Sequence, residues 1–181
     1  MAKIIFILGG ARSGKSSYAI ELAKKLRKRT AFIATCVSPD NEMKKRIKVH
    51  KKSRPKHWKL IEEGRDIGFC LANLKNEYET ILIDCLGLWI SNLLAENLTD
   101  KEIEKKINSL AQFISRFKAN IILVSNEVGS GIVPDNLLAR RFRDLLGLAN
   151  QIMAKIAGEV IFMQSGIPLT IKGEWKNAET K

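Results

Sequence analysis

The feature that most constrains this chain is its first turn, which joins an apolar run to a helix-like segment. Residues 4–8 read Ile-Ile-Phe-Ile-Leu, and Gly-Gly-Ala-Arg-Ser-Gly-Lys-Ser follows at residues 9–16. The apolar run is typical of a buried parallel strand, and residues 17–26 are typical of a helix. Four positions match the phosphate-binding pattern G-x-x-x-x-G-K-[ST], namely Gly9, Gly14, Lys15 and Ser16. A plain glycine-rich turn is the alternative, but both flanking elements favour phosphate binding.

The residue types of this loop explain what it binds. Glycines let successive backbone N–H groups point inward, and the helix N-terminus adds partial positive charge. Lys15 is expected to reach the outer phosphates of a nucleotide and to act in catalysis, while the Ser16 hydroxyl is expected to ligate Mg²⁺. The loop therefore predicts a Mg²⁺-bound nucleoside triphosphate as ligand.

Length and composition set the domain count and the class of protein. The chain has 181 residues, of which 45% are hydrophobic and 28% charged, so one globular domain over residues 1–181 is expected. No apolar run approaches the roughly 18 residues of a membrane span. The short run at residues 4–8 precedes the phosphate loop without a cleavage site, so it is interpreted as part of the fold.

Charge and cysteine content indicate the surroundings of the protein. Lys and Arg total 31 against 19 Asp and Glu, a net charge of +12. The excess of positive charge is spread over most predicted helices without a nucleic-acid motif, so a surface that attracts anionic substrates is favoured over nucleic-acid binding.

The three cysteines, Cys36, Cys70 and Cys85, are odd in number and lack a C-x-x-C pair. They indicate a reduced, cytoplasmic protein without disulfide or zinc sites.

Strand-like and helix-like segments alternate along the rest of the chain. Further strands are expected at residues 30–34, 80–84, 121–124, 160–163 and 167–171. Helices are expected at residues 42–52, 66–74, 86–94, 99–117 and from 134 onward. Residues 58–62 are interpreted as an extended piece within an insertion or crossover. The alternation predicts an α/β fold of the P-loop NTPase type, with a doubly wound, mostly parallel sheet and helices on both faces.

Three of these segments carry further expectations. Asp84 ends a strand, and an acid there is the usual metal partner of a phosphate loop, so it is predicted to contact Mg²⁺ directly or through water. The loop at residues 125–131 is either a third wall of the site or a plain loop. The apolar segment at residues 86–94 is expected to be a buried or interface helix.

The sequence contains two histidines, and His50 is the more interesting one. It lies among Arg46, Lys48, Lys51 and Lys52, which on composition alone favours a solvated helix with an incidental histidine. Those cations would nevertheless lower the pKa of the imidazole and keep it neutral and nucleophilic beside a bound triphosphate. His57 has no assigned chemistry.

A family resemblance bears on this choice. The blocks GGARSGKS, FIAT, RIKVHKKSRPKHW, VSNEVGSGIVPDNLLARRFRDLLGLANQ and SGIPLTIK resemble the bifunctional adenosylcobinamide kinase/adenosylcobinamide-phosphate guanylyltransferase of cobalamin biosynthesis, over residues 4–172. The resemblance implies phosphorylation of adenosylcobinamide by ATP or GTP. It also implies transfer of GMP from GTP through a covalent GMP-histidine to adenosylcobinamide phosphate, and a homotrimer.

The resemblance also implies site residues. His50 corresponds to the family nucleophile, and Val49 stands where some members have a second histidine. The nucleotide contacts carry over to Gly9, Gly10, Ala11, Arg12, Ser13, Gly14, Lys15, Ser16, Ile33, Ala34, Thr35, Lys51, Lys52, Ser53, Arg54, Glu62 and Asp84. Ser16 and Asp84 are the expected metal ligands.

Three alternatives stay open at this point. The first is a P-loop small-molecule kinase without a covalent histidine, and the second is a nucleotide-dependent switch or RNA-binding module that uses the positive charge. The third is a protein that retains only one of the two half-reactions. The sequence does not decide whether ATP or GTP serves the kinase step, nor which residues hold the corrinoid.

Overall fold

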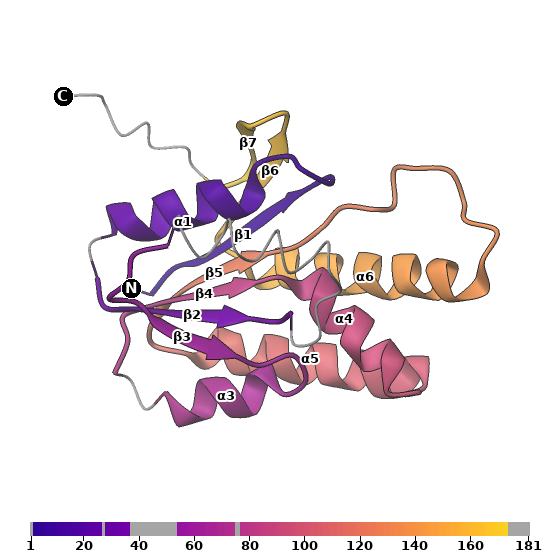
Figure 1. Cartoon of the computed structure of the whole chain (residues 1–181), viewed down its shortest axis with the longest axis horizontal. Helices are drawn as coiled ribbons and strands as arrows, with labels where there is room; N and C mark the ends of the chain where they lie inside the picture. Colours follow the sequence, from indigo (N-terminus) through magenta and orange to yellow (C-terminus); the bar gives the residue numbers. More distant parts are fainter. Residues whose placement is uncertain (1, 27, 37–53, 75–76, 174–181) are drawn as a thin grey trace.

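The computed structural model describes residues 2–26, 28–36, 54–74 and 77–173. Strands and helices alternate along them, as the sequence predicts (Figure 1). The elements are β1 (Ile4–Gly9), α1 (Lys15–Lys25), β2 (Thr30–Ala34), β3 (Lys59–Glu62), α3 (Ile67–Asn73), β4 (Thr80–Asp84), α4 (Leu86–Ala95), α5 (Asp100–Arg116), β5 (Asn120–Val124), α6 (Leu137–Ile156), β6 (Glu159–Gln164) and β7 (Ile167–Lys172). The helix expected at residues 42–52 lies outside the described residues.

All seven strands belong to one sheet, in the order β3-β2-β4-β5-β1-β6-β7. Every pairing is parallel except that of β6 with β7, which is antiparallel. The extended piece at residues 58–62 contributes β3, which pairs with β2 as one edge of the sheet. Because β1 lies between β5 and β6, the phosphate loop follows a central strand, and the predicted mostly parallel, doubly wound sheet is confirmed.

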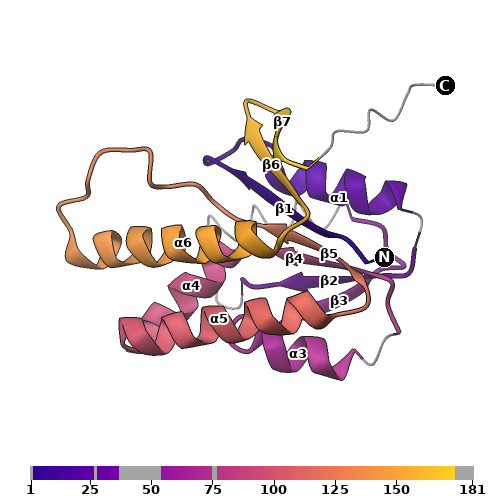
Figure 2. The ribbon, with the colours of Figure 1, turned by 180° about the vertical axis from the view of Figure 1, so that it is seen from behind.

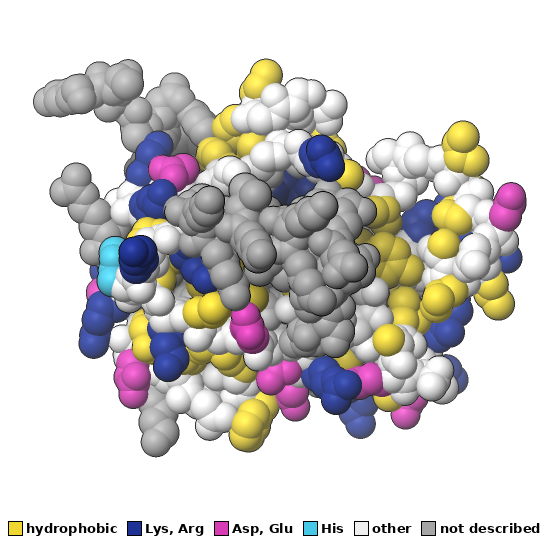
Figure 3. Space-filling view, in the orientation of Figure 1, with side chains coloured by type: hydrophobic (Ala, Val, Ile, Leu, Met, Phe, Trp, Pro, Cys, Tyr) yellow, Lys and Arg dark blue, Asp and Glu magenta, His cyan; other side chains and the backbone are white. Residues whose placement is uncertain are grey.

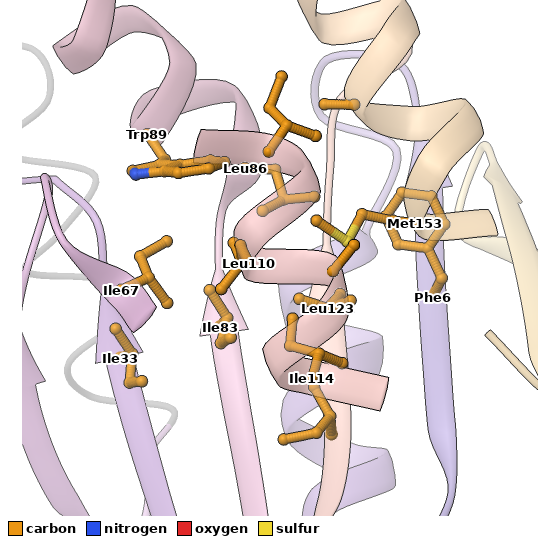
Figure 4. Close-up of a cluster of buried hydrophobic side chains, with 14 of the residues drawn as sticks. Phe6, Ile33, Ile67, Ile83, Leu86, Trp89, Leu110, Ile114, Leu123 and Met153 are labelled. Carbon is orange, nitrogen blue, oxygen red and sulfur yellow. The ribbon is translucent and has the colours of Figure 1, made fainter. Parts of the chain in front are cut away.

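Helices cover both faces of the sheet (Figures 1 and 2), and the residues of β1 alternate between two cores. Phe6 and Leu8 enter the larger core, where α3, α4, α5 and α6 pack (Figure 4). Ile5 and Ile7 enter the second core, where they meet the buried residues of α1. A strand that is buried on both faces needs an unbroken apolar sequence, which is what residues 4–8 supply.

The first turns of two long helices are fixed by polar side chains. At the start of α5, Thr99 and Glu102 form the predicted capping box, with Thr99 accepting from the Glu102 backbone and Glu102 from the Thr99 backbone. At the start of α6, the Asn136 side chain accepts from the Ala139 N–H at 3.1 Å. These caps satisfy N–H groups that have no partner within their helix.

The helix α4 is an interior element. Leu86, Trp89, Ile90 and Leu93 are at most 2% exposed, so of the two predicted roles the buried one is correct for this helix. None of the helices in the described part of the chain is long and apolar enough to cross a membrane.

Large exposed hydrophobic side chains gather elsewhere, in the loop before α6 and its first turn. Ile132, Val133, Leu137 and Leu138 are all more than half exposed. Figure 3 shows hydrophobic side chains on the surface in this region, beyond the end of the sheet.

Candidate functional site

The phosphate loop joins β1 to α1 through backbone conformations that only certain residues adopt easily. Gly9 has φ 153° and Gly14 has φ 92°, and Arg12 at φ 55° adds a left-handed residue between them. A Cβ on Gly9 would lie 2.4 Å from the Met163 carbonyl oxygen of β6. Glycine is therefore required at this position by both conformation and space.

Lys15 is buried in this loop despite its charge, at 7% exposure. Its Nζ donates to the Gly10 carbonyl at 2.6 Å and to Ser13 Oγ at 3.4 Å. Burial lowers the pKa of Lys15, while the neighbouring Cys85 and Asp84 act in the opposite direction. An anionic phosphate near Nζ would favour the charged form, so this ammonium group is well placed to bind one.

The carboxyl end of β4 is tied to the end of β2 by a buried hydroxyl. Thr35 Oγ1 accepts from the Cys85 N–H and donates to the Cys85 carbonyl, both at 2.8 Å. From α4, the Asn92 side-chain amide donates to the Thr35 carbonyl at 2.8 Å and to the Gly64 carbonyl at 3.0 Å. This network fixes the chain directly after Asp84, where the peptide bond to Cys85 is cis.

These strand ends and the phosphate loop surround a cavity of about 440 Å³. Lys15, Ser16 and Asp84 line one part of it, and their ammonium, hydroxyl and carboxylate groups suit a phosphate with its metal ion. The remaining wall carries Phe32, Leu60, Leu88, Arg54 and Glu62. The Arg54 guanidinium lies 4.6 Å from the Phe32 ring centroid, a cation–π contact.

Comparison with known proteins decides the family. The family described as cobinamide kinase / cobinamide phosphate guanyltransferase matches residues 5–171. The chain belongs to this family. The predicted recognition is therefore confirmed, and with it an enzyme of cobalamin biosynthesis with a kinase and a guanylyltransferase activity.

Individual relatives agree over nearly their full length. The bifunctional adenosylcobalamin biosynthesis protein CobP of Pseudomonas aeruginosa is 39% identical over 170 residues, covering 93% of this chain and 96% of the relative. The proteins of the same description named CobU from Escherichia coli and Salmonella typhimurium are each 38% identical over 181 residues, covering 93% of this chain and 99% of the relative.

Most of the predicted site residues that the structure describes lie on the cavity. The lining includes Ala11, Arg12, Ser13, Gly14, Lys15, Ser16, Ala34, Arg54, Glu62 and Asp84. Gly9 and Gly10 shape the loop without lining the cavity, and Ile33 and Thr35 are completely buried beside it. His50, Lys51, Lys52 and Ser53 lie outside the described residues, so their roles stay predictions.

The sequence reasoning did not single out several residues of the cavity wall. The cavity wall also includes apolar residues and cysteines of the strands, of the segments directly after them and of α4, namely Phe32, Cys36, Leu60, Cys85, Leu88 and Val124. Ordinary core positions carry the same residue types, so no local signal distinguishes them. The loop at residues 125–131 was expected to be either a third wall or a plain loop, and of its residues Asn126 alone lines the cavity.

The arginines near the start of α6 serve the fold of their own chain. Arg140 donates to the carbonyls of Pro134 and Asp135 at 2.9 and 2.6 Å. Arg141 forms an ion pair with Asp100 at 2.7 Å, which ties α6 to the start of α5. Arg140 thus braces the end of the loop that precedes α6, and Arg141 holds α6 against the start of α5.

The residues of the cavity also fit a magnesium ion. Within residues 2–26, 28–36, 54–74 and 77–173, no group of three or more His, Cys, Asp or Glu residues could hold a metal. Mg²⁺ is usually held by one or two protein oxygens together with substrate phosphates and water. The Ser16 hydroxyl and the Asp84 carboxylate, both on the cavity wall, supply that donor set.

Proposed function

We propose that this cavity binds ATP or GTP with Mg²⁺ and serves two reactions on adenosylcobinamide. The observation that carries the proposal is the buried Lys15 beside Ser16 and Asp84 on one cavity wall, in a chain of this family. Ser16 and Asp84 would hold Mg²⁺, which neutralises developing phosphate charge when bound. Adenosylcobinamide and its phosphate are the proposed partners, in the cytoplasm.

In the first reaction, the acceptor hydroxyl of adenosylcobinamide attacks the γ-phosphorus. A new phosphorus–oxygen bond forms, the bond to the β–γ bridging oxygen breaks, and its electron pair leaves with the nucleoside diphosphate. The hydroxyl proton passes to solvent. Lys15 and the backbone N–H groups of the phosphate loop would stabilise charge on the outer phosphates throughout.

In the second reaction, the proposed nucleophile is His50, whose role rests on the family resemblance. An imidazole nitrogen attacks the α-phosphorus of GTP, and pyrophosphate leaves with the electron pair of the broken bond. A phosphate oxygen of the substrate then attacks the same phosphorus and releases the histidine, giving adenosylcobinamide-GDP. Arg54, four residues after His50 in the sequence, lines the cavity, which supports this assignment, together with the predicted contacts of Lys51, Lys52 and Ser53.

Intact-protein mass spectrometry after incubation with GTP and Mg²⁺ tests the covalent step. We expect one GMP adduct that is labile in acid, and no adduct on a His50→Ala variant. His57→Ala is the matched control and should keep the adduct. An adduct that persists on His50→Ala would reject the nucleophile, and its absence from the wild-type protein would favour a kinase without the histidine step.

The proposed assembly is a homotrimer, which native mass spectrometry of the same sample would measure. Exposed hydrophobic side chains before and within the first turn of α6 support contacts with other copies. Nucleic-acid binding has less support, because the Lys and Arg side chains of the described residues lie at separate places on the face in Figure 3.

A further inference from the structure

Asn126 follows the strand that lies between the strand ending at Asp84 and the strand leading into the phosphate loop. It follows β5 by two residues, and β5 lies between β4, which ends at Asp84, and β1, which leads into the phosphate loop. The carboxyl ends of parallel strands meet at one edge of the sheet. Asn126 accordingly lines the same cavity as Lys15 and Asp84.

The backbone around Asn126 is fixed on both sides. The Ser125 N–H donates to the Ile7 carbonyl and the Glu127 N–H to the Gly9 carbonyl, both at 2.9 Å. These bonds continue the pairing of β5 with β1 as far as the first glycine of the phosphate loop. The position of Asn126 is thus tied to that of the loop.

A buried amide from α6 adds a second restraint. Asn150 is 7% exposed, and its Nδ2 donates to the Asn126 carbonyl at 3.0 Å. Its Oδ1 accepts from Ser125 Oγ at 2.6 Å. Burying polar groups is costly unless they are paired, and here both pairings hold the strand end rather than the helix.

The side chain of Asn126 is left available. Its Nδ2 would lie 3.2 Å from a Cβ placed on Gly87, so it rests against the first turn of α4, close after Asp84. Among the described residues, its amide makes no hydrogen bond, whereas the neighbouring Glu127 side chain accepts from the Gly129 N–H. A polar side chain that lines a phosphate cavity on a fixed backbone, and that has no hydrogen-bond partner in the described part of the chain, is suited to contact the substrate.

We infer that the Asn126 carboxamide is a catalytic residue of the phosphorylation step. Its Nδ2–H donates to a non-bridging oxygen of the γ-phosphoryl group while the acceptor hydroxyl forms its bond to phosphorus and the β–γ bond breaks. This N–H stabilises the negative charge that shifts on these oxygens, and because it is neutral it would not repel a Mg²⁺ ion held by Ser16 and Asp84. This inference rests on the nucleotide site proposed above.

Steady-state kinetics of adenosylcobinamide phosphorylation tests it on the full-length enzyme. For Asn126→Ala, kcat should fall by about 10- to 100-fold, because a hydrogen bond to a charged group is lost in the transition state. The Kd of β,γ-methylene ATP should change by less than about threefold, since the phosphate loop holds the ground state. Asn126→Asp should lower kcat further, because it places a carboxylate against the phosphates.

Two reference variants separate the possible failures. Glu127→Gln alters the next side chain, which does not line the cavity, and should keep kcat within about twofold. Lys15→Met should abolish phosphorylation. If Lys15→Met stays active, the nucleotide site itself is misplaced. If Lys15→Met is inactive, the nucleotide site is supported. The catalytic role of Asn126 is then refuted if both Asn126 variants keep kcat within about twofold, or if kcat falls only in proportion to nucleotide affinity.

Discussion

The Thr35 hydroxyl gives the sharpest prediction for stability. It is completely buried and makes two hydrogen bonds of 2.8 Å to the backbone of Cys85, one as acceptor and one as donor. Thr35→Val keeps the shape of the side chain and removes only the polar atom. The Cys85 N–H then loses its hydrogen-bond partner, whereas the Cys85 carbonyl still accepts from the Trp89 N–H at 3.2 Å.

The size of the effect follows from this N–H group alone. A buried backbone N–H left unsatisfied costs about 1–3 kcal/mol, so the free energy of unfolding should fall by about 1–3 kcal/mol. In a domain of this size, that loss lowers the Tm by roughly 2–12 °C.

Thr80 offers a matched control for the same chemical change. It is also completely buried, at the start of β4, but its hydroxyl has no hydrogen-bond partner within the described residues. Thr80→Val should therefore leave the stability unchanged or raise it by up to about 1 kcal/mol. Urea denaturation followed by circular dichroism would measure both variants. Equal losses for the two, or a Thr35→Val loss below about 0.5 kcal/mol, would refute the reasoning.

Three further predictions concern the phosphate loop and the cysteines. Gly9→Ala should lower the Tm strongly, because its Cβ would lie 2.4 Å from the Met163 carbonyl oxygen. A Cβ on Gly10 would have no atom within 4 Å, so Gly10→Ala should change the Tm by less than about 2 °C. Equal Tm values for the two variants would contradict this. Burial raises the pKa of Cys70 to about 11 and of Cys85 to about 12, so iodoacetamide at pH 8 should modify the cavity residue Cys36 first. Bound ATP should slow the modification of Cys36. Peptide mass mapping would measure both effects. In the unfolded chain the Cys70 and Cys85 thiols ionise near their ordinary pKa of 9.0. The stability that they contribute is therefore present below pH 9 and is lost as the pH rises toward 11 and 12. A free energy of unfolding that rises over this range would contradict the burial of these thiols.

Local patterns in the sequence were sufficient for the elements and for the nucleotide loop. The run at residues 4–8 and the capping box at Thr99 each depend on neighbours within a few positions, and both are found as predicted. The start of α1 was misjudged by two residues, because Lys15 and Ser16 belong at once to the phosphate loop and to the helix. A motif and a helix share backbone N–H groups there, so the boundary falls inside the motif.

What depends on strand order could not be predicted from the sequence. The position of β1 between β5 and β6 arises from pairings across more than 100 residues. That order places Asn126 on the same cavity as Asp84 and Lys15, whereas the sequence left its loop as either a third wall of the site or a plain loop. Likewise, Thr35 matches a family contact by sequence, but only the three-dimensional structure reveals that its hydroxyl is occupied by Cys85.

The place of β1 in the sheet also affects how the protein is made. Both of its partners, β5 and β6, are synthesised more than 100 residues later, and the turn after β6 closes on the loop through the Gly166 N–H and the Ser13 carbonyl at 3.0 Å. At about 5–20 residues per second, the nascent chain carries this apolar strand without either partner for roughly 6–22 s, until β5 emerges. Because the hydrogen bond between Gly166 and Ser13 forms only after β6 and the following turn have been made, we expect bound nucleotide to stabilise β1 fully only at the end of synthesis.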